Sequence, residues 1–96
     1  MSGMLEEAQE ATRAISAEFH GETVTTSAFF HSLIVEQLGQ VAHAYVHGGR
    51  RAQGIEVDIA DVIVCCLAYL NWLGVDASEA FQRALARHER GIAASR

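Results

Sequence analysis

Five side chains able to bind or assist a metal ion fall into two groups along this chain. The stretch IVEQLGQV carries Glu36, Gln37 and Gln40, and Asp58 and Asp61 follow later. Carboxylate and amide oxygens are ligands that hard cations such as Mg²⁺ prefer. The spacing of the residues decides whether the two groups meet.

An antiparallel helical hairpin that turns near Gly49 brings the two groups level. Both helices rise equally per residue, so Gln40 lies opposite Asp58 and Gln37 lies opposite Asp61. Each pair is spaced i, i+3 and shares one side of its helix. Polar groups inside a mostly apolar hairpin are costly unless they are paired or bind an ion. The spacing therefore predicts one layer of four oxygen-bearing side chains.

The pattern of the whole chain predicts four helices in a single domain, residues 1–96. It contains no proline, which favours long uninterrupted helices. We expect the first helix to end near Gly21 and the third to run from about Ile55 to Leu73. The second helix is expected to begin with an N-cap at Thr25, Thr26 or Ser27 and to end at Gly48 and Gly49. The third helix should end at Gly74, and a capping box of Asp76 and Glu79 should begin the fourth.

Apolar residues at spacings of three and four define the expected inner faces. These are Leu5, Ala8, Thr12, Ile15 and Phe19 in the first helix, Phe30, Ile34, Leu38, Val41 and Tyr45 in the second, and Ala80, Phe81, Ala84, Leu85 and His88 in the fourth. Residues 62–70 of the third helix are apolar on every face, which predicts a central buried helix. They are too few to span a bilayer. We therefore expect an all-α oligomeric bundle, a homodimer or dimer of dimers held by the surface from Val62 to Leu73.

Net charge, the first residues and the cysteines limit the classes of partner and the cellular compartment. The formal charge of −5 disfavours nucleic acid and anionic membranes as partners. The first residues, MSGMLEEAQE, do not form a secretory signal, which predicts a cytoplasmic protein. Adjacent Cys65 and Cys66 point to different sides of a helix, so we expect reduced, buried thiols.

The polar segments and their flanks resemble the MazG-like nucleotide pyrophosphohydrolases, members of the all-α NTP pyrophosphatase group. The signature of that family is EExxE on one helix and, after a variable spacer, ExxD on the next. The corresponding segments here read EQLGQ and DIAD. EQLGQVAHA is similar to the family's EELGELAEA, and DIADVIVCCLAYLNWLGVDASEA is similar to its second conserved segment. The resemblance covers residues 30–90.

The resemblance implies hydrolysis of a nucleoside triphosphate to the monophosphate and pyrophosphate, a nucleotide-pool cleaning reaction. It implies that Gln37, Gln40, Asp58 and Asp61 hold Mg²⁺, with Mn²⁺ as a substitute, and that Glu36 orients or activates the attacking water. The two glutamines replace acids, so these positions carry two negative charges instead of four. That loss lowers cation affinity, and we expect one weakly held ion bound chiefly by the two aspartates.

This departure leaves two other interpretations open. The chain is then a degenerate relative that binds nucleotide or a partner without turnover, or a purely structural helical homodimer. In the structural interpretation Asp58 caps the third helix, and Glu36, Gln37 and Gln40 form a solvated polar face.

Three further residues are candidates for substrate binding. Arg87 is the nearest match to a basic residue that holds phosphates in the family. Asn71 and Trp72 are suited to hydrogen bonding and stacking with a nucleobase, although interface packing also explains Trp72. His43 and His47 have the i, i+4 spacing of a transition-metal clamp, but a surface position near the helix C-terminus, favoured there by the dipole, is the better explanation.

Overall fold

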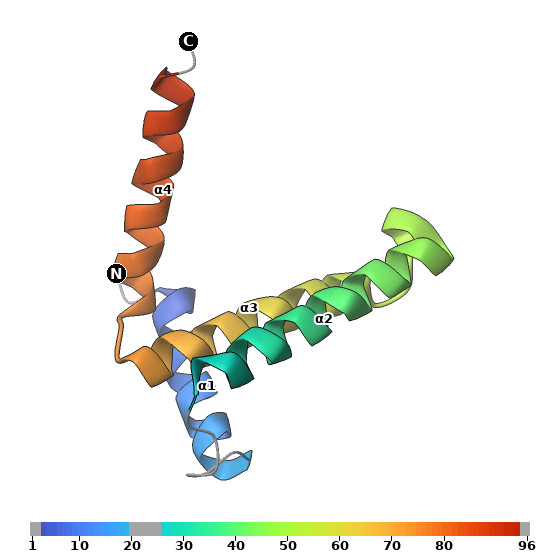
Figure 1. Ribbon diagram of the computed structural model, residues 1–96, viewed down its shortest axis with the longest axis horizontal. Coiled ribbons are helices and arrows are strands. Elements are labelled where there is room, and N and C mark those ends of the chain that lie inside the picture. Colours follow the sequence, from blue (N-terminus) through green and yellow to red (C-terminus); the bar gives the residue numbers. More distant parts are fainter. Residues whose placement is uncertain (1–2, 20–25, 95–96) are drawn as a thin grey trace.

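A computed structural model describes residues 3–19 and 26–94, and within these ranges all regular secondary structure is helical. The four predicted helices are confirmed (Figure 1): α1 is Met4–Phe19, α2 is Ser27–Gly48, α3 is Ile55–Leu73 and α4 is Ala77–Ala94, with a short 3₁₀ helix η1, Gly49–Arg51, between α2 and α3. The predicted stop at Gly21, the cap candidate Thr25 and the side chain of Phe19 lie outside the described residues.

Two of the predicted helix boundaries have the expected chemistry. Thr26 is the N-cap of α2, and its hydroxyl accepts a hydrogen bond from the Phe29 N–H at 3.2 Å. Gly74 ends α3 with φ 75°, a left-handed conformation in which a β-carbon is strained. The N–H groups of Gly74 and Val75 donate to the carbonyls of Asn71 and Leu70, both at 3.0 Å, which is a Schellman motif.

The start of α4 corrects one expectation. Asp76 does cap the helix, because its carboxylate accepts a hydrogen bond from the Ser78 N–H at 3.1 Å. Glu79 does not complete a capping box. Its carboxylate instead pairs with Arg83 at 2.6 Å, one turn further along the exposed surface.

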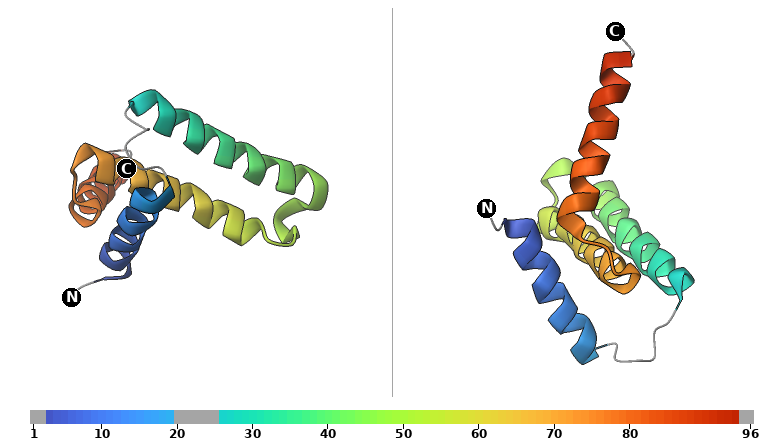
Figure 2. Two further views of the ribbon diagram at one scale, coloured as in Figure 1. Left: turned by 90° about the horizontal axis from the view of Figure 1, so that it is seen from below. Right: turned by 90° about the vertical axis from the view of Figure 1, so that its left-hand side faces the viewer.

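Helices α2 and α3 lie side by side and antiparallel as one hairpin, as predicted (Figures 1 and 2). Aromatic contacts fix their register, since Phe30 stacks on Tyr69 with ring centroids 5.1 Å apart. The same tyrosine hydroxyl lies 2.9 Å from Nε2 of His31. Equal rise from the Phe30–Tyr69 pair places Gln37 and Gln40 within about one residue of the levels of Asp61 and Asp58.

The buried core lies where α1 meets the end of α3 and the start of α4. Its hydrophobic residues are Phe30, Leu67, Ala68 and Ala77. Gln9 of α1 is 7% exposed, and its side chain both donates and accepts a hydrogen bond at the α3–α4 turn. Its amide donates to the Val75 carbonyl at 2.8 Å and accepts from the Ala77 N–H at 2.9 Å. Because both polar ends are satisfied, burial of this glutamine is compatible with stability.

Several expected inner residues are exposed. Leu38 is 51% and Tyr45 59% exposed, because the inner side of α2 passes through Gln37 instead. Ile15 of α1 is 50% exposed. Of the inner residues expected in α4, Phe81, Leu85 and His88 are exposed, and Ala80 and Ala84 are half-buried. The physical reason is the direction of α4, which turns 112° from α3 and projects away from the other helices (Figure 1).

Helix α3 is central, as expected, but a single chain does not bury it on all sides. It contacts α1, α2 and α4. Leu67 and Ala68 are buried by these neighbours, whereas Ile63 and Val64 are 53% and 43% exposed. Part of the surface expected to hold a partner is therefore covered within the chain, and the rest is open.

None of the described helices alone is long and apolar enough to cross a bilayer. Helix α3 together with Ala77–Ala93 of α4 has sufficient length and apolar composition, but only as a sharply bent pair.

Replacing Gln9 by alanine removes both hydrogen bonds to the α3–α4 turn and leaves a buried N–H and carbonyl without these partners. We predict a loss of about 1–3 kcal/mol in the free energy of unfolding, measured by urea denaturation. Gln82→Ala, at an exposed position of α4, is the matched control and should change stability by no more than about 0.5 kcal/mol. Equal effects of the two substitutions would show that Gln9 does not anchor the turn.

Candidate functional site

Gln37 occupies the side of α2 that faces α3. It shares one side of the helix with Phe30, Ile34 and Val41, and these four residues are spaced three or four apart. Gln37 is half-buried, as are Ile34 and Val41. Glu36 and Gln40 are exposed, one residue before Gln37 and three residues after it. One of the two glutamines is thus inside the hairpin, and the other lies at its edge.

Asp58 and Asp61 occupy the opposing side of α3. Both are half-buried, as are Val62 and Cys65, which continue the same side of the helix. Asp58 lies in the first turn of α3, where a negative charge interacts favourably with the helix dipole. It forms no cap hydrogen bond, because the N-cap is Gly54 and no side chain caps this end.

These side chains are not engaged by the rest of the described protein. Within residues 3–19 and 26–94, no hydrogen bond or ion pair is formed by the side chains of Glu36, Gln37, Gln40, Asp58 or Asp61. Half-buried carboxylates without a protein partner lose solvation and gain no compensating contact. Their oxygens are accordingly available to a ligand.

The two cysteines report on the electrostatics of this region. Burial raises the pKa of the Cys65 thiol above its ordinary value of 9.0, and the negative charges of Cys66, Asp61 and Glu36 raise it further. Carboxylates from both helices therefore act on one thiol. Burial alone raises the pKa of Cys66. Both thiols are free, as expected, but they are half-buried rather than fully buried.

The donor set fits a weakly held hard cation. Asp58, Asp61 and Gln37 offer two carboxylates and one amide oxygen, and Mg²⁺ commonly keeps several water or phosphate ligands. No group of three or more His, Cys, Asp and Glu side chains suited to a metal ion occurs in the described part of the chain. Any ion here would thus depend on oxygens brought by its substrate.

The predicted base-binding residues are not beside the acids in a single chain. Asn71 and Trp72 lie ten or more residues beyond Asp61 along α3, about 15 Å. The Asn71 amide donates to the Gln9 carbonyl at 3.1 Å, and its oxygen accepts from Arg13 at 3.3 Å. Trp72 packs against Phe30, with ring centroids 5.5 Å apart, and remains 41% exposed. Both residues therefore have structural contacts already.

Arg87 is also separate from the acids. It is exposed on the projecting part of α4 and lines a shallow pocket with Arg83 and Glu79. Helix α4 approaches α1 and the end of α3, whereas the acids lie along the α2–α3 hairpin (Figure 1). One chain therefore does not assemble Arg87 with the predicted metal ligands.

The histidine pair on α2 remains a two-ligand arrangement. The rings of His43 and His47 lie with centroids 4.3 Å apart, and both residues are exposed. Among the described residues no third metal-binding side chain joins them. Their spacing is that of a clamp, but the remaining coordination would come from outside this site.

Sequence reasoning assigned no role to His31, which lies beside Glu36 at an open hollow of about 400 Å³. Ser32 and Val35 complete its lining. The signal that could have located His31 is its register with Tyr69 across the hairpin, where the two side chains meet at 2.9 Å. Because Glu36 lines this hollow, its carboxylate borders a space that solvent or a ligand can enter.

Comparison with known proteins identifies no relative: no family model, curated protein or solved structure matches this chain.

Neutralising Asp61 should lower the pKa of Cys65, because one of the negative charges that disfavour the thiolate is removed. We predict that Asp61→Asn, in a Cys66→Ala background, alkylates faster with iodoacetamide at pH 8.5 than the background alone. Glu56→Gln is the matched control on an exposed position of α3 and should leave the rate unchanged. An unchanged rate in Asp61→Asn would contradict the proximity of this carboxylate to Cys65.

Proposed function

We propose that this protein is a Mg²⁺-dependent nucleoside triphosphate pyrophosphohydrolase that releases pyrophosphate and the nucleoside monophosphate. The observation that carries the proposal is the pair of half-buried carboxylates, Asp58 and Asp61, on the side of α3 that faces Gln37, with no hydrogen-bond or ion-pair partner among the described residues. Glu36 shares their electrostatic environment at Cys65. The resemblance to MazG-like enzymes supplies the reaction and the MazG-like domain assignment.

Each residue has a role that follows from its place. Asp58 and Asp61 would hold the cation, and Gln37 and Gln40 would contribute neutral oxygens from the facing helix. A bound Mg²⁺, or Mn²⁺ in its place, neutralises charge on the triphosphate and polarises the phosphorus–oxygen bond. Glu36 lies at the accessible edge and would orient the water and accept its proton. In a complete site Arg87 would contact phosphate, and Asn71 and Trp72 would contact the base.

The charge balance predicts that the cation arrives with its substrate. Two carboxylates offset one divalent ion but leave no excess negative charge to concentrate it. A triphosphate supplies both additional charge and additional oxygen ligands. The expected affinity for free Mg²⁺ is therefore weak, and the nucleotide complex is the species that binds.

Two alternatives remain, and each has its own observation. Gln37 and Gln40 favour a degenerate relative that binds nucleotide or a partner protein without turnover. The existing contacts of Asn71 and Trp72 and the distant position of Arg87 favour a structural helical homodimer. In all three cases we propose that the partner subunit is a second copy, as a homodimer or dimer of dimers, in the cytoplasm. Neither nucleic acid nor a membrane is a proposed partner.

Restoring the two acids tests the proposal directly. We predict that Gln37→Glu with Gln40→Glu raises the rate of pyrophosphate release by about tenfold or more, because two added charges strengthen cation binding in the transition state. The measurement is pyrophosphate release across canonical and modified triphosphates with Mg²⁺ or Mn²⁺. Gln82→Glu adds the same kind of charge to an exposed site on α4 and should have no effect.

The outcomes separate the three functions. Absence of release from both wild type and the restored variant, at high enzyme concentration, would contradict the enzymatic proposal. If nucleotide and metal together still raise the melting temperature, the binding alternative stands. Absence of both release and a thermal shift would leave the structural homodimer.

A further inference from the structure

The isolated chain exposes much more surface than a globular protein of its mass. Its accessible area is 7314 Å², whereas a compact 10.4 kDa monomer exposes about 5,400 Å². The radius of gyration is 15.5 Å, against about 12.5 Å for a compact domain of this length. The surplus, about 1,900 Å², exceeds the roughly 800 Å² that one partner contributes to a standard interface.

Helix α4 contributes exposed apolar side chains, and these form one continuous stripe together with His88. Phe81, Leu85, His88 and Ile92 follow one another at spacings of four, three and four. Phe81, Leu85 and Ile92 are 56%, 46% and 56% exposed, and His88 is exposed too. This alternation is that of the a and d positions of a helix that packs along another helix.

Most charged residues of α4 lie away from this stripe. Arg83 and Glu79 pair with each other at 2.6 Å and are 78% and 61% exposed. Arg90 lies about 140° around the helix from Leu85. Glu89 lies about 40° from Leu85 and borders one edge of the stripe. The other edge carries Ala84 and Gly91, so a second helix can approach closely on that side.

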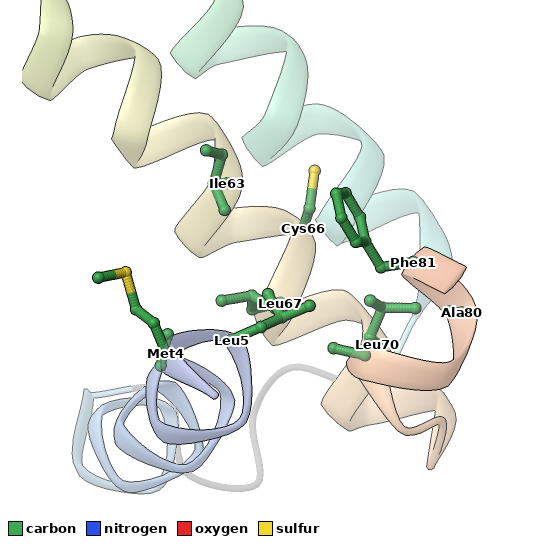
Figure 3. Close-up of a pocket in the computed structure, with 10 residues that line it drawn as sticks. Met4, Leu5, Ile63, Cys66, Leu67, Leu70, Ala80 and Phe81 are labelled. Atoms are coloured by element: carbon green, nitrogen blue, oxygen red, sulfur yellow. The ribbon is translucent and has the colours of Figure 1, made fainter. Parts of the chain in front are cut away.

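The stripe continues into an apolar groove at the base of α4. The groove has a volume of about 620 Å³ and lies between α1, α3 and α4 (Figure 3). Its walls include Met4, Leu5, Ile63, Cys66, Leu70 and Phe81. Phe81 belongs to both surfaces, and Figure 3 places it among the groove residues. Groove and stripe thus form one surface.

We propose that this surface binds the α4 helix of a second copy of this chain, in an antiparallel, two-fold symmetric pair. Antiparallel alignment about the point between Ala86 and Arg87 places Phe81 opposite the partner's Ile92 and Leu85 opposite the partner's His88. The same alignment carries the end of the partner's α4 to the groove beside Phe81. A self-complementary surface of this kind is what a two-fold dimer requires.

This pairing goes beyond the proposed function and can be tested without nucleotide. Leu85→Asp should halve the assembly mass measured by size-exclusion chromatography with light scattering, because a charge then replaces the centre of the stripe. Arg90→Asp, on the opposite side of α4, should leave the mass unchanged. Circular dichroism should show equal helicity for both variants, since both positions are exposed on α4. A wild-type mass of 10.4 kDa, or no change in Leu85→Asp, would overturn the proposal.

Cross-linking tests the orientation. In a Cys65→Ala, Cys66→Ala background, a mixture of Leu85→Cys and His88→Cys chains should form several times more disulfide dimer than either variant alone. Predominant cross-linking of Leu85→Cys with itself would indicate parallel helices and overturn the antiparallel geometry. No cross-link in any sample would overturn the pairing itself, whatever the result of the pyrophosphate assay.

Discussion

The register of α2 against α3 is the constraint on which the rest of this structure depends. The stack of Phe30 on Tyr69 and the contact between His31 and Tyr69 hold one end of the hairpin, and the turn at η1 closes the other. A shift of two residues along either helix would rotate Gln37 or Asp61 away from the facing helix. The polar layer therefore exists because aromatic packing elsewhere sets its alignment.

The position of α1 depends on a different interaction at the opposite side of α3. Gln9 connects α1 to the turn that begins α4, so the core, the turn and the direction of α4 are coupled. Because α4 leaves at 112° from α3, its apolar stripe cannot fold back onto its own chain. The same geometry that completes the small core thus creates the exposed surface that we assign to a second copy.

The polar layer and the apolar surface follow opposite physical rules. Half-buried carboxylates favour a cation because burial weakens their solvation without supplying a protein partner. The exposed stripe favours another protein chain because apolar area gains free energy when it leaves water. Phosphates and metal would be excluded from the second surface, and a hydrophobic helix from the first. One 96-residue chain can therefore carry a ligand site and an assembly surface on different faces.

The helix caps and the α2–α3 register were predictable from the sequence, whereas the direction of α4 was not. Thr26, Gly74 and Asp76 have signals within a few residues, and the α2–α3 register follows from a short turn and equal helical rise. The exposure of Leu38 and Tyr45 was missed because several apolar faces of α2 compete and the polar Gln37 occupies the inner one. The angle of α4 depends on Gln9, 68 residues away from Ala77, and no local pattern encodes that contact.

We propose that the hairpin acids hold a divalent cation together with a triphosphate. Electron paramagnetic resonance of Mn²⁺, titrated with and without a non-hydrolysable nucleoside triphosphate, measures this binding directly. We expect weak binding of Mn²⁺ alone, tighter binding of the nucleotide complex, and loss of that gain in Asp58→Asn with Asp61→Asn. Equal binding of the Mn²⁺–nucleotide complex by wild type and by this double variant would show that the two aspartates do not hold the cation.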